Sequence, residues 1–280
     1  MATQLPDLKP PFLPRLWLPA SPRPHFPPPA QPLRIKVSYT KAVTVCIAAI
    51  AQARNGSRIV LCCDSRLDQG VFGSSNYAPK LNFVGTNWLA MISGRWKPAQ
   101  ELVKFIKSHF QNSISRTSDA MLAAVDAAKD FRASAFFSKQ ATEEAIITGF
   151  AGGDPIVLHV IGNMSVESLP YGSIGEGSYI ASMMMNQRDY SQNRPVEQVA
   201  YIVYEAKRCS EKVGSVGKDT TLVIQSPRDG KEPPNTVNMD WFDHPGLARM
   251  DAMYKKYWLQ SINTIGKRLT KGWFVNPKAL

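Results

Sequence analysis

The sequence predicts an α+β fold in which helices are layered on antiparallel sheets. Strand-like and helix-like segments follow one another in blocks, in the order strands, two helices, strands, two helices and a strand, rather than alternating singly. Short turns containing Asn or Gly join neighbouring strand-like segments, as in antiparallel hairpins. The length of 280 residues and the hydrophobic content of 44% suffice for a full buried core.

The first four strands are expected as two hairpins. Residues 44–51 and 59–63 are rich in β-branched and small apolar residues, and Asn55-Gly56 lies in the turn between them. Residues 81–84 and 88–92 form the second pair, linked by Gly85-Thr86-Asn87. A third hairpin is expected from residues 145–150 and 156–160, around Gly152-Gly153-Asp154.

Four helices are expected in the body of the chain. Pro98 can open the first, whose apolar stripe ends at Phe110, and Ser118 can cap the second, whose stripe ends at Phe131. A third helix starts after Gly177 and a fourth near Pro195. A last strand at 220–225 closes the body.

The two ends of the chain differ in composition from the body. Residues 1–43 hold 11 of the 21 prolines, which predicts an extended segment, either a propeptide or a docking tail. Residues 226–280 form a basic C-terminal extension with a helix expected at 245–265. The domain between them, 44–225, is the predicted folded body.

Charge and apolar patterning exclude several classes of function. The net charge of +11 resides mainly in the two extensions, and the body is nearly balanced, so a nucleic-acid role is disfavoured. The apolar segments are too short for a transmembrane helix, and the N-terminal segment lacks the apolar region of a secretory signal. We therefore expect a cytoplasmic protein without a membrane partner.

Cysteine and histidine positions predict no metal site. The four cysteines follow no zinc spacing and are too few for a disulfide scaffold, and the four histidines are scattered. Nucleotide-binding and serine-hydrolase motifs are also incomplete: Gly217-Lys218 lacks the preceding glycine of a phosphate-binding loop, and Gly175-Glu176-Gly177 lacks the third glycine of a dinucleotide fingerprint. No cofactor is expected.

Four residues form a spaced set that no other motif explains: Thr44, Asp64, Lys80 and Gly94. In the segments Thr44-Val-Cys-Ile, Cys63-Asp64-Ser65-Arg66 and Met91-Ile-Ser-Gly94, and in the gaps around Lys80, the sequence resembles the proteasome beta-subunit family of N-terminal-nucleophile (Ntn) hydrolases, which includes bacterial proteasome-like peptidases. The resemblance implies a four-layer αββα sandwich over residues 44–225.

The same resemblance assigns chemistry to the set. Thr44 would be the nucleophile of a threonine-type endopeptidase, and its own α-amine, freed by removal of residues 1–43, would be the base. The Lys80 ammonium would disfavour protonation of that amine, so that the amine can accept a proton near neutral pH. Asp64 would hold Lys80 in place, and the Gly94 N–H would stabilise the oxyanion. Peptide hydrolysis of this kind needs no metal or organic cofactor.

Further positions follow from the same resemblance, among them a fifth catalytic residue. Ser215 would support Thr44, and the specificity pocket would be lined by Leu67, Ala78, Ile92 and Trp96. Residues that could assist the nucleophile are Arg66, Glu176 and Asp219. Three positions depart from the family pattern: Val43 replaces the usual glycine, Glu176 a serine and Lys212 a carboxylate, for which Glu211 or Asp219 would have to substitute.

Several alternatives remain open at this point. The chain could be an inactive structural subunit of the same fold, or an Ntn amidase acting on small amides. Cys46 lies two residues after Thr44 and is either a buried structural residue or a second nucleophile. As partners, the resemblance implies polypeptide substrates and a homo-oligomeric ring, and it leaves open whether an ATP-dependent unfoldase takes part.

Overall fold

The computed structural model describes residues 44–65, 67–68, 74–75, 80–111, 114–138, 142–161, 164–228 and 237–257. The chain divides into two units, Met1–Ser38 and Tyr39–Leu280, and every described residue belongs to the second unit. The expectations for residues 1–43 therefore lie outside the described residues.

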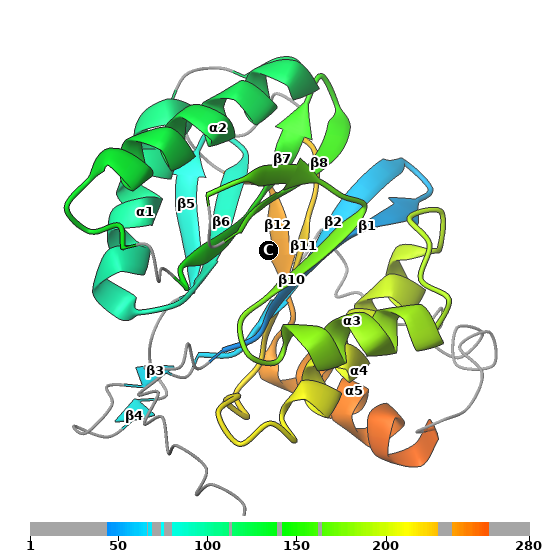
Figure 1. Cartoon of the computed structure of the whole chain (residues 1–280). Coiled ribbons are helices and arrows are strands. Elements are labelled where there is room, and N and C mark those ends of the chain that lie inside the picture. Colours follow the sequence, from blue (N-terminus) through cyan, green and yellow to red (C-terminus); the bar gives the residue numbers. More distant parts are fainter. Residues whose placement is uncertain are drawn as a thin grey trace, which may run out of the picture. The chain divides into compact units, whose positions relative to one another are not determined.

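Most described strands form two five-stranded antiparallel sheets (Figure 1). The first has the order β10-β1-β2-β11-β12, with bounds Tyr171–Ile174, Cys46–Ala53, Gly56–Cys63, Thr221–Gln225 and Met239–Trp241. The second has the order β5-β6-β7-β8-β9, with bounds Leu81–Gly85, Trp88–Ser93, Glu144–Ala151, Asp154–Val160 and Val166–Ser168. A short pair joins β3 (Leu67–Asp68) to β4 (Ser74–Ser75).

Five helices are present in the described part of the chain. Their bounds are α1 Trp96–Phe110, α2 Thr117–Ala133, α3 Ser178–Gln187, α4 Val196–Ser210 and α5 His244–Tyr257. Two antiparallel sheets with helices inserted in blocks confirm the predicted α+β class. None of these helices is long and apolar enough to cross a bilayer.

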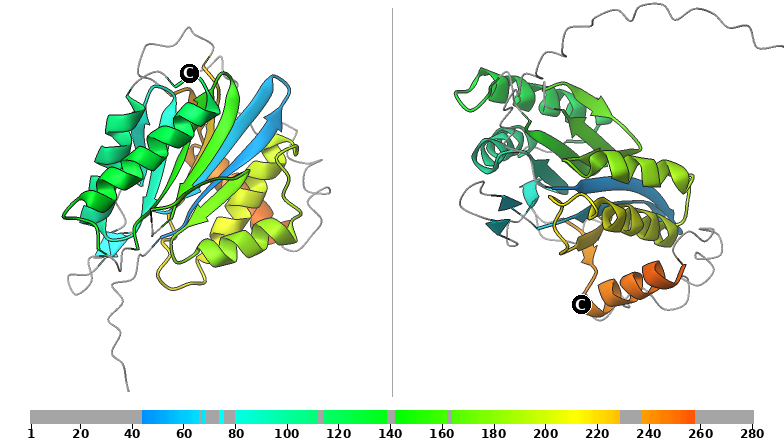
Figure 2. Two further views of the ribbon diagram at one scale, coloured as in Figure 1. Left: turned by 45° about the horizontal axis from the view of Figure 1, so that its top comes forward. Right: turned by 60° about the horizontal axis from the view of Figure 1, so that its bottom comes forward.

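Alternation along the strands produces three apolar clusters. One face of β6 and β7 packs against α1 and α2, and one face of β1 and β2 packs against α3 and α4, with α5 contacting α4 in the same cluster. The opposite faces of the same strands share a third cluster, in which Cys46 and Leu61 of the first sheet join Leu89 and Ile146 of the second. Figure 2 shows the two helix pairs on opposite sides of the strands.

The turn that joins β1 to β2 is set by its register. Ala53 pairs with Gly56, so Arg54 and Asn55 form the turn, and Gly56 follows it with φ +99°. A positive φ is costly for residues with a Cβ atom, which explains why glycine follows the turn. The Asn-Gly signal thus marks the hairpin correctly, with glycine one position after the two-residue turn.

Other local predictions differ from the structure in detail. Pro98 lies in the first turn of α1, where proline is tolerated. Ser118 does not cap α2: the residue before the helix is Arg116, and the Ser118 hydroxyl contacts Asp119 instead. In the C-terminal extension, β12 was not predicted, and α5 covers the first part of the expected helix, whose remainder lies outside the described residues.

Candidate active site

Three segments bring Thr44, Asp64 and Lys80 together. Thr44 immediately precedes β1, Asp64 follows the end of β2, and Lys80 precedes β5 of the other sheet. Because Cys46 pairs with Cys63 in the β1–β2 ladder, the start of one strand and the end of the next lie side by side. The hairpin register therefore places Thr44 and Asp64 in contact although 20 positions separate them.

The three side chains form a closed set of hydrogen bonds. The Thr44 hydroxyl donates to Asp64 Oδ1 at 2.6 Å. The Lys80 ammonium donates to the same carboxylate oxygen at 2.9 Å and also to Thr44 Oγ1. The predicted nucleophile, carboxylate and lysine are thus adjacent, which is the arrangement that the sequence resemblance implies.

The set is almost completely removed from solvent. The exposed fractions are 2% for Thr44, 0% for Asp64 and 6% for Lys80. Burying a lone charge is costly, so the opposite charges of Asp64 and Lys80 must compensate one another. In this setting the Lys80 ammonium is the positive charge closest to the threonine hydroxyl among the contacts described.

Asp64 is also bound by the backbone. Val45 N donates to Oδ1 at 3.1 Å and Gly217 N donates to Oδ2 at 2.8 Å. The loop after α4 is held in turn by Lys207, whose ammonium donates to the carbonyl of Lys218 at 2.9 Å and pairs with Glu211 at 2.5 Å. Asp64 is therefore fixed by two strand ends and by this loop.

A second loop encloses the backbone of Thr44. Gly177 N donates to the Thr44 carbonyl at 3.2 Å. Gly175 has φ +88°, and a Cβ atom there would overlap Thr44 Cγ2 and its carbonyl. At Gly177 a Cβ would lie 2.9 Å from Val45 Cβ, Ser210 Cβ and Val216 Cγ2. The incomplete dinucleotide motif is thus a packing feature that lets the loop approach Thr44 closely.

Gly94 follows β6 with φ +112°, and a Cβ atom there would lie 2.7 Å from Glu143 Cα. Two consecutive acidic residues hold its neighbours. The buried Glu143 pairs with Arg95 at 2.7 Å, and Glu144 Oε2 accepts from Ser93 Oγ at 3.4 Å. Sequence reasoning missed both, because two acids before a strand resemble an ordinary solvated strand end.

The other residues that were predicted to assist Thr44 have fewer described contacts with it than Asp64 and Lys80 have. The Ser215 hydroxyl is buried and has no hydrogen-bond partner among the described residues. Glu176 is half-buried between the two glycines that enclose Thr44. Asp219 is exposed, and Glu211 is engaged by Lys207 and Arg208, so neither substitutes for the missing carboxylate through a contact with Thr44.

Of the four residues predicted to line the specificity pocket, Ile92 and Trp96 have side chains that the structure describes. Ile92 is 2% exposed and packs in the cluster beneath α1 and α2, because alternation along β6 turns it away from the other sheet. Trp96 is the first residue of α1 and is 37% exposed. The backbone of Leu67 lies in β3, while Arg66 and Ala78 lie outside the described residues.

Cys46 occupies an environment that suppresses nucleophilic chemistry. Its thiol is fully buried and donates to the Ile92 carbonyl at 3.6 Å. Burial, and then the neighbouring Cys63, raise the pKa of the Cys46 thiol well above its ordinary value. Because the thiolate is the reactive form, the structure favours the structural role over the second-nucleophile role.

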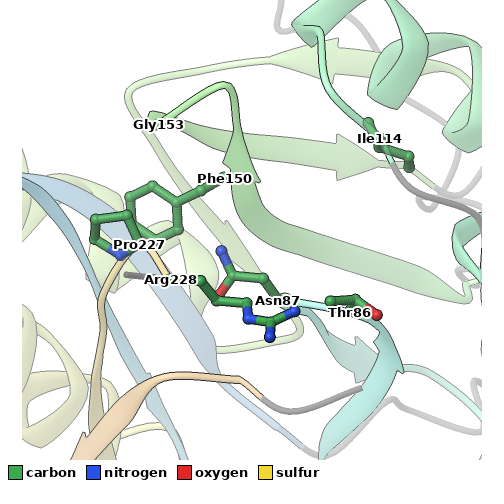
Figure 3. A pocket seen from close by; sticks show the side chains of 7 residues that line it. All are labelled: Thr86, Asn87, Ile114, Phe150, Gly153, Pro227 and Arg228. Atoms are coloured by element: carbon green, nitrogen blue, oxygen red, sulfur yellow. The ribbon is translucent and has the colours of Figure 1, made fainter. Parts of the chain in front are cut away.

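A separate pocket of about 290 Å³ lies at the other end of β6 (Figure 3). Asn87, which precedes this strand, and Phe150, at the end of β7, line it together with Arg228. Thr44 and Gly94 do not belong to its lining, so it is distinct from the buried set. Among the described residues, no cluster of three or more His, Cys, Asp or Glu side chains could hold a metal ion.

Comparison with known proteins identifies the fold. No protein-family model and no curated protein sequence matches the chain. The solved structure of the Anbu (Gly-1) mutant from Hyphomicrobium sp. strain MC1 matches with a TM-score of 0.59 at 16% sequence identity, over 83% of this chain and 99% of that chain. Anbu is a bacterial proteasome-like protein of the Ntn-hydrolase fold. At this level of identity, the likeness establishes a similar fold and nothing further.

Proposed function

We propose that the protein is a threonine-type peptidase of the Ntn-hydrolase kind, with Thr44 as its nucleophile after residues 1–43 are removed. The observation that carries this proposal is the double donation by Lys80, whose ammonium contacts both Thr44 Oγ1 and Asp64 Oδ1. A buried cation at a hydroxyl oxygen stabilises negative charge there, which a threonine nucleophile requires.

In the first half of the reaction, the freed α-amine of Thr44 takes the hydroxyl proton as Oγ1 attacks the substrate carbonyl carbon. A C–Oγ1 bond forms and the carbonyl oxygen becomes an oxyanion, for which the Gly94 N–H is the proposed donor. The C–N bond then breaks, and the proton held by the amine passes to the leaving nitrogen. The product of this half is an ester between Thr44 and the acyl part of the substrate.

In the second half, water replaces the leaving amine. The α-amine accepts a proton from water as the water oxygen bonds to the ester carbon, and the C–Oγ1 bond then breaks. The proton returns to Oγ1 and a carboxylic acid is released. Throughout both halves, the Lys80 charge disfavours protonation of the nearby amine, and Asp64 keeps Lys80 in place.

The arrangement of the apolar clusters supports the wider part of the proposal. Two clusters lie between a sheet and its helices and a third lies between the sheets, as in a four-layer αββα sandwich. We assign that architecture to residues 44–225, with extensions at 1–43 and 226–280. Polypeptide substrates and a homo-oligomeric ring in the cytoplasm belong to the same proposal, because the family resemblance implies them.

A second candidate function is a non-catalytic subunit of the same fold. The observation that favours it is the number of backbone contacts at Asp64, which ties Val45 and Gly217 together as well as binding Lys80. Such a set could be kept for stability alone. The two candidates differ in whether the Thr44 hydroxyl reacts.

The test is covalent labelling with a β-lactone peptide mimic, combined with hydrolysis of fluorogenic peptides and small amides, on protein expressed from the full sequence and purified after removal of residues 1–43. We expect one adduct, located on Thr44 by mass spectrometry, and loss of both labelling and hydrolysis in Thr44→Ala. Thr117→Ala, at the exposed start of α2, is the matched control and should retain both. Hydrolysis of small amides but not of peptides would favour the amidase, and an unlabelled wild-type chain would favour the non-catalytic subunit.

A further inference from the structure

We propose that Glu144 is a positioning residue that fixes the separation between Thr44 and the backbone N–H of Gly94. Thr44 belongs to one sheet and Gly94 to the other, so hydrolysis requires the two sheets to keep a defined spacing at this end. The inference deepens the proposed function and rests on it for its catalytic part. Its structural part stands on the hydrogen bonds of the Glu144 carboxylate.

One carboxylate oxygen of Glu144 joins the two sheets. Glu144 is the first residue of β7 and pairs with Ser93 at the end of β6. Its Oε2 accepts from the backbone N–H of Gly175 at 3.1 Å and from Ser93 Oγ at 3.4 Å. Gly175 follows β10, which pairs with β1 in the other sheet. The two donors therefore come from opposite sides of the site.

The bond to Gly175 controls Thr44 through direct packing. Gly175 has no space for a Cβ because Thr44 fills it, and Gly177 donates to the Thr44 carbonyl at 3.2 Å. Any shift of this loop must therefore shift the threonine or break the contact. By accepting from Gly175 N, the Glu144 carboxylate fixes the loop, and through the loop it fixes the nucleophile.

The bond to Ser93 acts on the other side. Ser93 immediately precedes Gly94, and Arg95, which follows it, is paired with Glu143 at 2.7 Å. Glu143 and Glu144 thus hold the two residues that flank Gly94. Of these two acids, Glu144 alone is also bonded to the loop at Thr44 among the described contacts, which makes it the link between nucleophile and oxyanion donor.

Because both donors contact Oε2, one uncharged acceptor oxygen at the same distance from the backbone would be sufficient to bind both. Glu144→Gln keeps such an oxygen and should retain the link. Glu144→Asp withdraws the oxygen by about 1.5 Å, one carbon–carbon bond, and Glu144→Met keeps the length without an acceptor. A role based on charge would instead predict that Gln fails. Positioning by hydrogen bonds therefore predicts that the link is strongest with Glu, is retained with Gln, and is lost with Asp and with Met.

The structural part is tested by hydrogen exchange at the Gly175 amide in the purified full chain, which requires no catalysis. We expect Glu144→Met to accelerate this exchange about tenfold, the effect of losing one net hydrogen bond, and Glu144→Gln to leave it near the wild-type rate. Glu167→Met is the matched control, because Glu167 is exposed and contacts neither Gly175 nor Ser93 in the described structure. Equal exchange in wild type and Glu144→Met would overturn the proposal.

The catalytic part is tested with two electrophiles that differ in their need for an oxyanion donor. A β-lactone passes through a tetrahedral oxyanion when Oγ1 attacks it, whereas addition to a peptide vinyl sulfone does not form one. We expect Glu144→Met to slow lactone acylation about 10²-fold, the scale of a misplaced reacting group, and vinyl sulfone addition much less. Equal slowing of both would contradict control of spacing.

These two experiments separate the possible failures. If the wild-type chain reacts with neither electrophile, the proposed function fails, while the exchange experiment still decides whether Glu144 fixes the loop. If the wild-type chain reacts but the Glu144→Gln and Glu144→Met variants behave alike in both experiments, positioning by hydrogen bonds is wrong. Recovery in Gln alone, with no effect of Glu167→Met, supports it.

Discussion

At the residue scale, the Asp64 carboxylate combines support of the fold with support of the proposed chemistry. Its two oxygens accept from the Thr44 hydroxyl, two backbone N–H groups and the Lys80 ammonium. Lys80 supplies the compensating positive charge, so removing it leaves a buried carboxylate without a cation among its described contacts. The stability and the reactivity of this site are therefore coupled through one ion pair.

Substitution of this lysine gives the first prediction. Lys80→Met should lower the free energy of unfolding by about 3–5 kcal/mol, the cost of breaking a buried ion pair from one side. It should also abolish labelling of Thr44 at temperatures where the variant is still folded. Denaturant unfolding and covalent labelling measure the two effects. Lys104→Met, on an exposed helical ion pair, should change neither, and a Lys80 variant as stable as wild type would contradict the account.

His159 gives a prediction on pH. Burial lowers the pKa of His159 below its ordinary value of 6.5, and the nearby Glu144 and Glu167 only partly oppose this shift. At pH values below 6.5 the unfolded chain therefore binds more protons at this residue than the folded chain, and the free energy of unfolding falls as the pH falls.

His159→Gln removes this proton uptake. Denaturant unfolding measured between neutral pH and about pH 5 should show a shallower loss of stability in the variant than in wild type. His244→Gln, at the exposed start of α5, is the control and should follow the wild-type curve. An unchanged slope in His159→Gln would show that other groups cause the acid sensitivity.

At the scale of elements, the loop between β10 and α3 depends on glycine for two separable reasons. Gly175 combines a positive φ of +88° with direct contact to Thr44. Gly153, in the turn between β7 and β8, has φ +94°, and no atom lies within 4 Å of the place that a Cβ would occupy there. The two positions share the backbone strain and differ in the contact. They form a natural pair for comparison.

Alanine substitution at both positions should separate the two costs. Gly153→Ala should destabilise the protein by about 1–2 kcal/mol, the cost of a left-handed conformation for an L-residue. Gly175→Ala should cost clearly more and should also displace Thr44, so that covalent labelling is lost. Thermal unfolding and labelling of the two variants provide the measurements. Equal stability and equal labelling would mean that the loop does not hold the threonine.

The C-terminal helix is the second element with a direct test. Met250, Met253 and Tyr257 of α5 are buried in the same apolar cluster as residues of α4, so this part of the extension packs as core. Met250→Ala should cost about 2–5 kcal/mol, as for other buried large-to-small changes, whereas Met183→Ala, which is 54% exposed, should stay within about 0.5 kcal/mol. Comparable small effects in chemical denaturation would show that α5 is not integral to the folded unit.

The limits of prediction from sequence are also clearest at this scale. The hairpins were predictable because turns containing Asn or Gly and short apolar runs are local signals. The cap at Ser118 was wrong, since the helix begins at Thr117 and the residue before it, Arg116, makes no side-chain cap hydrogen bond. β12 has only three residues and a mixed sequence, so nothing local marks it, and it is defined by its pairing with β11.

In the candidate site, too, some residues could be predicted from the sequence, whereas others are defined only by contacts between distant segments. Thr44, Asp64 and Lys80 could be grouped through the family resemblance, and the β1–β2 register places Thr44 beside Asp64, to which Lys80 also binds. Glu144 could not be found in this way, because its partners Ser93 and Gly175 are distant in sequence and become neighbours only when the two sheets are in place. Ile92 packs in the cluster beneath α1 and α2, because the register of β6 determines the direction of its side chain.

At the scale of the whole described unit, two sheets, each with its own helical layer, pack face to face across an apolar cluster. Thr44, Gly94 and Glu144 lie at one end of this pair of sheets. The first sheet contributes the nucleophile and Asp64, and the second contributes Gly94 and Glu144, while Lys80 enters from the segment before β5. The apolar cluster between the sheets maintains this junction. Hydrolysis by Thr44, however, requires its α-amine to be free.

The most direct test of the account is the N-terminus of the purified protein. Intact mass and N-terminal sequencing should be performed on the wild-type chain and on Thr44→Ala in parallel. The account predicts a mature wild-type chain that begins at Thr44 and a Thr44→Ala chain that keeps residues 1–43. A full-length chain in both preparations would leave Thr44 without a free amine and would contradict the proposed threonine peptidase.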